Sequence, residues 1–182
     1  MANTNSPFGF RLVRDRTNGG SVPYTLVATY ATKLGKGDPV ALTGSGPNVE
    51  RAAGDAVTVI GVVNGFEYTD VGGQRQWATY WPGNVGYTDV KVIVDPVDAG
   101  QEWEVQTDTC AVTDIGAHAD ATVADASATL ARSQTVLAAS STGTSGKLFR
   151  IDRLKETSAY GAYAVVIGRF VEGANLHASG GV

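Results

Sequence analysis

The residues able to carry out nucleophilic or acid–base chemistry are few and far apart in this sequence of 182 residues. Its two histidines, His118 and His177, both fall in segments without a regular hydrophobic pattern. A Ser-His-Asp triad needs its nucleophile within hydrogen-bond reach of a base that the fold holds rigidly. Ser45 lies between two glycines, but their spacing differs from that of a nucleophile elbow. We therefore expect no catalytic triad and no enzyme activity.

The sequence gives equally little indication of a metal or cofactor site. Cys110 is the single cysteine, so it can form no disulfide within the chain, and zinc would need a close cluster of cysteines and histidines. Asp114, Asp120 and Asp125 offer the oxygen ligands that calcium prefers, but their spacing matches no calcium loop and favours solvated loop carboxylates. No glycine-rich phosphate-binding motif follows a predicted strand. We expect no metal and no cofactor.

Glu102 and Glu104 are the best-placed pair of carboxylates. On a strand, the two side chains share a face about 7 Å apart, within the range that glycosidase carboxylates use. The alternation with Trp103 and Val105 favours a different interpretation, in which the apolar residues face a core and the glutamates face solvent. We therefore predict a half-exposed strand rather than an acid–base pair.

Four aromatic residues around a Pro-Gly turn form a cluster that suggests a ligand. Such rings stack on sugar rings, so a carbohydrate-binding or host-adhesion module is the alternative function. Tryptophan and tyrosine at a turn also commonly close the end of a β-sandwich, and we favour that interpretation. The residues of this candidate glycan platform are Trp77, Tyr80, Trp81 and Tyr87.

The elements that must position these residues are strands. Alanine, valine, glycine and threonine fill 89 of the 182 positions, and glycine and β-branched residues disfavour long helices. Polar and apolar positions alternate, as is typical of strands, with turn signals about every 8 to 12 residues. This pattern predicts an all-β fold, a single antiparallel β-sandwich or jelly-roll-like domain. The strand candidates are 24–30, 57–63, 65–68, 74–81, 89–95, 102–106, 148–154 and 162–171.

Four segments fall outside this strand pattern. Residues 1–9 form a polar, extended N-terminal arm that we expect to bury little against its own domain, and residues 173–182 form a short, flexible C-terminal tail. Residues 117–131 are rich in Ala, Asp, Thr and Ser, which predicts a long loop or one weak helical turn. Residues 140–146 are predicted to be a turn. The β-sandwich domain is then expected over residues 10–172.

Charge and hydropathy limit the kinds of partner and the cellular compartment that we expect for this chain. The net charge is −4 and no run of three basic residues occurs, so nucleic-acid binding is not expected. The first twenty residues lack the apolar run of a signal peptide, and no stretch approaches the roughly 20 apolar residues that cross a bilayer. Together with the single cysteine, these features predict a chain made in a reducing cytoplasm, without a membrane partner.

A series of short motifs runs through the chain from residue 6 to about residue 170. They are SPFGFRLVR at 6–14, GDPV at 37–40, GVVNGFEY at 61–68, YWP at 80–82, EVQ at 104–106, DIGA at 114–117, FRI at 149–151 and GAYAVV at 161–166. In this order, the chain resembles the capsid cement, or head decoration, proteins of tailed bacteriophages. The ordered set carries the resemblance, because no single motif is catalytic or ligand-binding.

The resemblance implies a jelly-roll or related β-sandwich on the outer surface of an icosahedral phage head. Such a protein bridges neighbouring major capsid protein subunits at sites that shell expansion creates, and it opposes the internal pressure of the packaged DNA. Its partners would be the major capsid protein and further copies of itself, as a homodimer or homotrimer. The chain would be made in the host bacterial cytoplasm and end in the virion.

The N-terminal arm is the candidate contact with a capsid subunit or a neighbouring copy. Its phenylalanines are expected to insert as aromatic anchors into pockets of the partner, and its arginines to pair with carboxylates there. The alternative for the phenylalanines, and for Phe10 above all, is that they close the end of this chain's own sandwich. The residues of this candidate clasp are Pro7, Phe8, Phe10, Arg11, Arg14 and Arg16.

Overall fold

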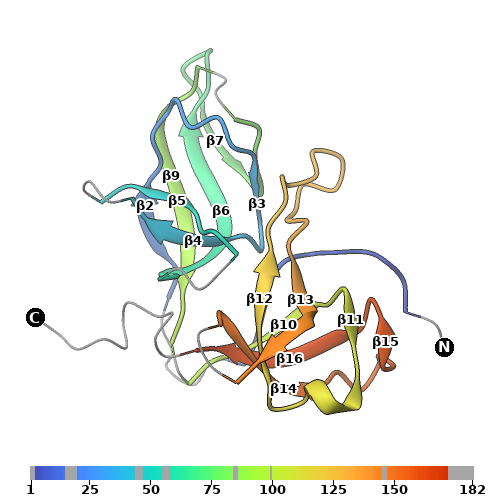
Figure 1. Ribbon diagram of the computed structural model, residues 1–182. Helices are drawn as coiled ribbons and strands as arrows, with labels where there is room; N and C mark the ends of the chain where they lie inside the picture. The colour runs from blue at the N-terminus through green and yellow to red at the C-terminus, as the bar shows by residue number, and fades with distance from the viewer. Residues whose placement is uncertain are drawn as a thin grey trace, which may run out of the picture.

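The computed structural model describes residues 3–14, 20–43, 47–54, 58–83, 86–98, 100–144 and 147–171. Within these ranges the regular structure is almost entirely antiparallel β (Figure 1), which confirms the predicted all-β, sandwich-like fold. The helical structure there is the 3-10 turn η1 (Val112–Asp114). No helix in this part of the chain has the length and apolar character needed to cross a membrane.

Two sheets contain most of the strands (Figure 1). In the order of their pairing, the strands of the first sheet are β1 (Arg11–Arg14), β10 (Glu102–Gln106), β16 (Val165–Phe170), β14 (Phe149–Leu154), β12 (His118–Thr122) and β13 (Val136–Gly143). Those of the second sheet are β2 (Val22–Thr25), β9 (Thr88–Pro96), β6 (Gly61–Thr69), β4 (Pro39–Leu42) and β5 (Val49–Arg51), with β7 (Arg75–Ala78) paired to β6. Two short pairs complete the fold, β3 (Leu34–Gly35) with β8 (Tyr80–Trp81) and β11 (Thr109–Cys110) with β15 (Gly161–Ala162).

Strand β9 shows how the sequence pattern becomes a sheet. Val90, Val92 and Val94 are buried, while Lys91 between them and Asp89 before them are exposed. Because successive side chains on a strand point to opposite faces, this alternation gives one face to the core and one to solvent. Strand β9 lies between β2 and β6 and pairs antiparallel with both.

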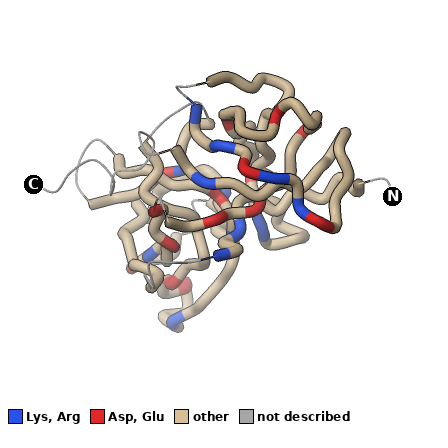
Figure 2. Tube along the Cα trace, turned by 90° about the horizontal axis from the view of Figure 1, so that it is seen from below, with Lys and Arg blue, Asp and Glu red and all other residues tan. Residues whose placement is uncertain are grey.

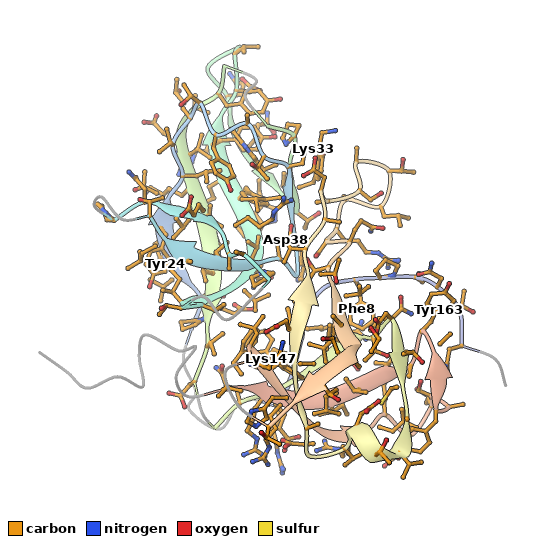
Figure 3. The ribbon with its side chains drawn as sticks, in the orientation of Figure 1. Phe8, Tyr24, Lys33, Asp38, Lys147 and Tyr163 are labelled. Atoms are coloured by element: carbon orange, nitrogen blue, oxygen red, sulfur yellow. The ribbon has the colours of Figure 1, made fainter. Side chains whose placement is uncertain are left out.

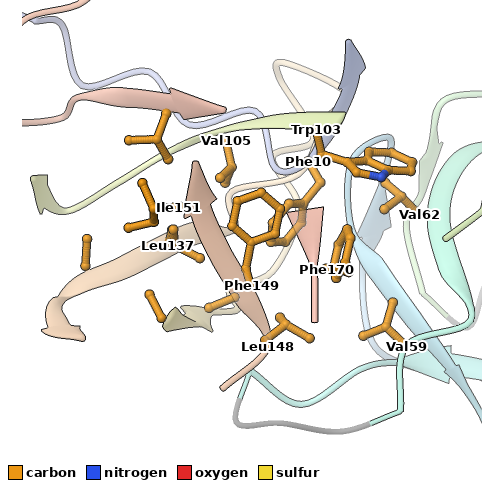
Figure 4. Packing of buried hydrophobic residues seen from close by; sticks show 14 of the residues in the cluster. Phe10, Val59, Val62, Trp103, Val105, Leu137, Leu148, Phe149, Ile151 and Phe170 are labelled. Carbon is orange, nitrogen blue, oxygen red and sulfur yellow. The ribbon is translucent and has the colours of Figure 1, made fainter. Parts of the chain in front are cut away.

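A first hydrophobic cluster is built mainly by the strands of the first sheet. The rings of Phe10, Phe149 and Phe170 contact one another, with centroids 4.8 to 5.4 Å apart, and Trp103 meets Phe170 edge to face (Figure 4). A second cluster lies in the second sheet around Phe66, Trp81 and the inward valines of β9. Each sheet therefore covers an apolar interior of its own.

The two groups of strands pack directly on each other at a junction. Val62 lies on β6 of the second sheet and Val59 lies just before that strand, but both pack in the first cluster. Backbone hydrogen bonds also cross the junction, from the N–H of Ser133 to the carbonyl of Lys36 at 2.9 Å and from the N–H of Ala121 to the carbonyl of Gly54 at 2.9 Å. Segments that are far apart in the sequence meet at this junction.

Two segments predicted to lack strands contain them. Strand β12 lies within the predicted loop at 117–131, and β13 extends into the predicted turn at 140–146. Ala119 and Ala121 of β12 are buried in the first cluster, and β12 pairs with β13 and β14 on its two sides. Both local predictions are wrong because tertiary pairing stabilises a strand whose alanines give little hydrophobic signal. The predicted tail at 173–182 lies outside the described residues.

Candidate functional site

The N-terminal segment is hydrogen-bonded along its own fold, while residues 4–6 stay exposed and residues 3, 7 and 8 are half-buried. The side chain of Asn3 donates to the carbonyls of Ala159 at 2.7 Å and Ala162 at 3.0 Å. Gln106 of β10 accepts from the Ser6 N–H at 3.0 Å and donates to the carbonyl of Thr4 at 2.8 Å. These bonds hold residues 3–6 against the first sheet. Figure 1 shows this segment running along the lower group of strands.

Phe10 is an interior residue of this chain. Its ring lies 5.3 Å from that of Phe149 and 4.8 Å from that of Phe170, and its side chain is almost fully buried (Figure 4). The hypothesis that Phe10 inserts into a partner is therefore corrected, and the alternative, that it closes this chain's own core, holds.

The remaining residues of the predicted clasp stay nearer the surface. Phe8 is half-buried, and the guanidinium of Arg11 lies over its ring at 5.0 Å, a cation–π contact. Arg11 also pairs with Glu104 of β10. Pro7 is half-buried and Arg14 is exposed at the end of β1, while Arg16 lies outside the described residues.

Three of the motif segments, 6–14, 37–40 and 61–68, meet at the junction. The N–H of Phe10 donates to the carbonyl of Gly37 at 2.8 Å, and the N–H of Gly37 donates to that of Val63 at 2.9 Å. Gly9 and Gly37 have φ angles of +72° and +99°, which favour glycine. A Cβ on Gly9 would collide with the carbonyl of Gly37 and with the side chain of Ser133. The backbones approach so closely that both positions need glycine.

Asp38 is a buried carboxylate at the same junction (Figure 3). It accepts hydrogen bonds from the Gly35 N–H at 2.8 Å, from the Thr135 hydroxyl at 3.0 Å and from the Ser133 hydroxyl. Burial raises the pKa of Asp38 above its ordinary value, although these hydrogen bonds and the charge of Arg51 act to lower it. Its donors come from both groups of strands, so Asp38 ties them together.

A pocket of about 340 Å³ opens beside these contacts. The N-terminal segment forms one wall through Phe8 and Leu12, and β6 forms another through Val62. The polar residues that line it are Arg11, Lys36, Asn64, Asp95 and Arg132. The sequence predicted Arg11 as a binding residue and missed the other four, although Lys36 stands directly before the GDPV motif. No sequence pattern links Arg132, more than 90 positions further along, to this place.

The two glutamates of β10 do not face solvent as predicted. Glu102 and Glu104 are 8% and 5% exposed, because basic side chains lie over them. Arg11 and Lys155 pair with Glu104, and Arg153 pairs with Glu102 at 2.8 Å. Figure 2 shows this lower group of strands from below, with basic and acidic positions side by side. Both carboxylates are therefore engaged by cations of this chain.

The candidate glycan platform is divided by the fold. Trp81 is fully buried and donates its indole N–H to the carbonyl of Tyr30 at 3.0 Å, while Tyr87 stacks on Tyr68 with centroids 4.3 Å apart. The prediction that these residues close the end of a sandwich fits Trp81 and Tyr87, and a role for Trp81 in direct sugar contact is corrected. Trp77 and Tyr80 instead line an open groove of about 460 Å³.

Trp77 is the most exposed aromatic ring of this groove, at 55%. Its ring lies against the backbone of Gly65 on β6, so closely that a Cβ at that position would collide with it. This contact holds the exposed ring in place on the sheet. The glycine at position 65, in the motif at 61–68, is the sequence feature that could have indicated this contact with Trp77.

The remaining titratable candidates are not grouped for catalysis. Burial, followed by the charges of Asp114 and Asp108, raises the pKa of the Cys110 thiol to about 11, which keeps it protonated near neutral pH. His118 is half-buried in β12, and His177 lies outside the described residues. Within the described ranges, no three His, Cys, Asp or Glu side chains are grouped to hold a metal ion.

Comparison with models of protein families, with curated proteins and with solved structures finds no match to this chain. The residues, the fold and the ordered motifs are therefore the basis for inferring its function.

Proposed function

We propose that this chain is a structural protein of a tailed-bacteriophage virion that binds the outside of the expanded head. There it bridges major capsid protein subunits and stabilises the shell against the pressure of the packaged DNA. The observation that carries the proposal is the ordered set of motifs, together with the meeting of three of them at the junction. Residues of all three segments line one pocket there, which offers a place for a partner to bind.

The proposed activity needs binding alone. A protein that prefers the expanded shell over its unexpanded precursor shifts the shell toward expansion in proportion to that preference. Many copies on one particle act together, so each contact can be weak. The surface for this contact includes Phe8, Arg11 and the pocket behind them, in place of the freely extended clasp expected from the sequence.

Self-association on the shell is part of the proposal. Both sheets end in edge strands, β1 and β13 in the first and β2 and β5 in the second. Edge strands are commonly paired or covered, and proteins on symmetry axes of a shell form dimers or trimers. Light scattering on the purified chain over a range of concentrations is expected to reveal a dimer or trimer. A monomer at every concentration would contradict self-association in solution.

The stability of DNA-filled heads tests the proposed role. Heads of the encoding phage that lack this protein are heated with increasing amounts of the purified chain, and DNA release is followed with an intercalating dye. We expect the release temperature to rise until the binding sites are filled. An unchanged release temperature at saturating protein would count against stabilisation of the shell.

Carbohydrate binding is a second candidate, and the seating of Trp77 on Gly65 favours it. An exposed ring held rigidly beside Tyr68 and Tyr80 is the arrangement on which a sugar ring stacks. Binding to a glycan array, lost in Trp77→Ala and retained in the control Tyr160→Ala, would support this role. No binding by the unaltered chain to any glycan on the array would rule it out.

A further inference from the structure

Two basic residues from paired backbone segments line the junction pocket. Lys36 and Arg132 are neighbours in a parallel backbone bridge, and both side chains line the pocket. Neither forms an ion pair with any of the described residues. Like charges on neighbouring strands repel each other, so this pair costs stability unless an anion lies between them.

Two residues that line the pocket each carry a buried hydrogen-bond donor that nothing in the described chain satisfies. The Nε of Arg132 and the indole Nε1 of Trp103 are buried without an acceptor, and Trp103 as a whole is 1% exposed. The other end of the Arg132 guanidinium donates to the hydroxyl of Ser6 at 2.7 Å, which fixes its position. Buried donors without acceptors are rare in folded proteins and cost free energy.

The one acidic group at the pocket wall is already occupied. Asp95 accepts from the side chain of Asn64 at 3.2 Å and from the hydroxyl of Ser21. Arg11, on the opposite side, is held by Glu104. Asp95 keeps its negative charge because its partners are neutral, but Lys36 and Arg132 outnumber it and leave the lining with a net positive charge, while Phe8, Leu12 and Val62 supply apolar walls. The pocket combines an unpaired positive end with an apolar surface large enough for one or two side chains.

We infer that this pocket binds a carboxylate-bearing peptide segment, with an acidic side chain between Lys36 and Arg132 and an apolar neighbour against Phe8. The donor of the segment is an acidic stretch of the shell subunit, and this part of the inference rests on the proposed function. A guanidinium and an ammonium form charge-assisted hydrogen bonds with a carboxylate. Apolar walls favour such a segment over a small, fully hydrated anion.

Nuclear magnetic resonance of the indole N–H groups tests the site directly, because Trp103 lines the pocket and Trp81 does not. The full ¹⁵N-labelled chain is titrated with the peptide acetyl-Leu-Glu-Leu-Asp-amide and with its neutral twin acetyl-Leu-Gln-Leu-Asn-amide. We expect the acidic peptide to move the Trp103 signal and leave the Trp81 signal in place. An equal response to both peptides, an equally tight response to inorganic phosphate, or no response of Trp103 would overturn the inference.

Matched variants separate recognition of the carboxylate from general charge. Lys36→Gln and Arg132→Gln are each expected to weaken binding of the acidic peptide about tenfold, the loss of one charge-assisted contact. Lys33→Gln removes the same charge from an exposed lysine outside the pocket and is expected to leave the affinity unchanged. Lys36 is exposed, so its variant is expected to fold normally. If Lys33→Gln weakens binding of the acidic peptide equally, the effect comes from the net charge of the chain, and the proposed site is contradicted.

Binding to expanded shells tests the source of the segment. If Lys36→Gln weakens binding to shells as it weakens binding of the peptide, the shell supplies the segment. If it weakens peptide binding alone, the proposed partner is wrong for this pocket while shell binding stands. If the unaltered chain binds the acidic peptide but no shell, the proposed function fails and the carboxylate site stands.

Discussion

Buried carboxylates are held in two different ways in this chain. Asp38 has neutral donors, two hydroxyls and a backbone N–H, whereas Glu104 lies under two cations. The pKa of Asp38 is raised, because burial disfavours its charge and its neutral donors compensate only in part. The same chemical group therefore ties the junction in one place and anchors a network of ion pairs in the other.

Replacing Asp38 by asparagine is expected to change how stability depends on pH. The folded chain holds the Asp38 proton more tightly than the unfolded chain, in which the pKa of Asp38 is near the ordinary 3.8. Between the two pKa values the folded state binds more protons, so the Asp38 contribution to the free energy of unfolding falls as pH rises through this window. Asp38→Asn lacks this ionisation.

Urea unfolding of both proteins from pH 3 to pH 8 measures the effect. The free energy of unfolding of the native chain minus that of Asp38→Asn is expected to decrease with rising pH and then level off. A difference that increases with pH would show that the folded state favours the charged carboxylate, contrary to this account.

Replacing Glu104 by glutamine is expected to lower the free energy of unfolding by about 1 to 3 kcal/mol. Its buried carboxylate receives both Arg11 and Lys155, and a neutral amide cannot compensate either charge. The matched control is Glu67→Gln, which breaks a more exposed pair with Arg75 and is expected to cost about 0.5 kcal/mol or less. If chemical denaturation shows that both variants lower the free energy of unfolding equally, the ion pairs of Glu104 contribute no more than an exposed surface pair.

At the scale of elements, the contact of Gly9 with Gly37 joins the N-terminal segment to the loop before β4. Gly9→Ala is expected to lower the free energy of unfolding by about 2 to 4 kcal/mol, from the strained φ and the collision with the Gly37 carbonyl together. Gly116→Ala is the control, since Gly116 has a φ of +88° and open space around it.

Gly116→Ala is expected to cost about 1 kcal/mol, the backbone strain alone. The two variants are compared by urea denaturation. If Gly9→Ala costs no more than Gly116→Ala, the junction is looser than the close approach of the two backbones implies.

The strands predicted from the sequence were those with large, alternating apolar side chains. In β9 and β10 the valines and Trp103 mark the buried face without help from distant residues. Strand β12 escaped prediction because its buried residues, Ala119 and Ala121, become interior only when β13 and β14 pair with it. A local sequence pattern predicts a strand when large apolar side chains of that strand form the core face. Strand β12 has only small alanines there, so its place in the sheet depends on pairing with other strands.

The candidate site was predicted only in part, for a related reason. The aromatic and arginine content of residues 7–14 indicated a binding segment, and Phe8 with Arg11 lies at the pocket. The burial of Phe10 depends on Phe149 and Phe170, which are about 140 to 160 positions away in the sequence. The covering of Glu102 and Glu104 likewise depends on cations from β1 and the end of β14. Contacts of this range have no local signature.

At the scale of the whole molecule, two sheets with separate apolar clusters meet at one junction, and the junction contains the proposed binding pocket. A ligand or shell surface there contacts the N-terminal segment, β6 and the segment before β13 at once. Binding at such a place stabilises the relative position of both sheets, so shell binding and chain stability are expected to be coupled. A low fraction of charged residues keeps the cost of desolvating such contacts small.

The affinity of the fluorescently labelled chain for expanded and for unexpanded shells of the phage that we propose encodes it tests the central claim most directly. The account predicts saturable binding that is at least about 100-fold tighter to expanded shells, equivalent to about 2.7 kcal/mol of stabilisation per site. Equal affinity for the two shell forms, or no binding to either, would contradict it.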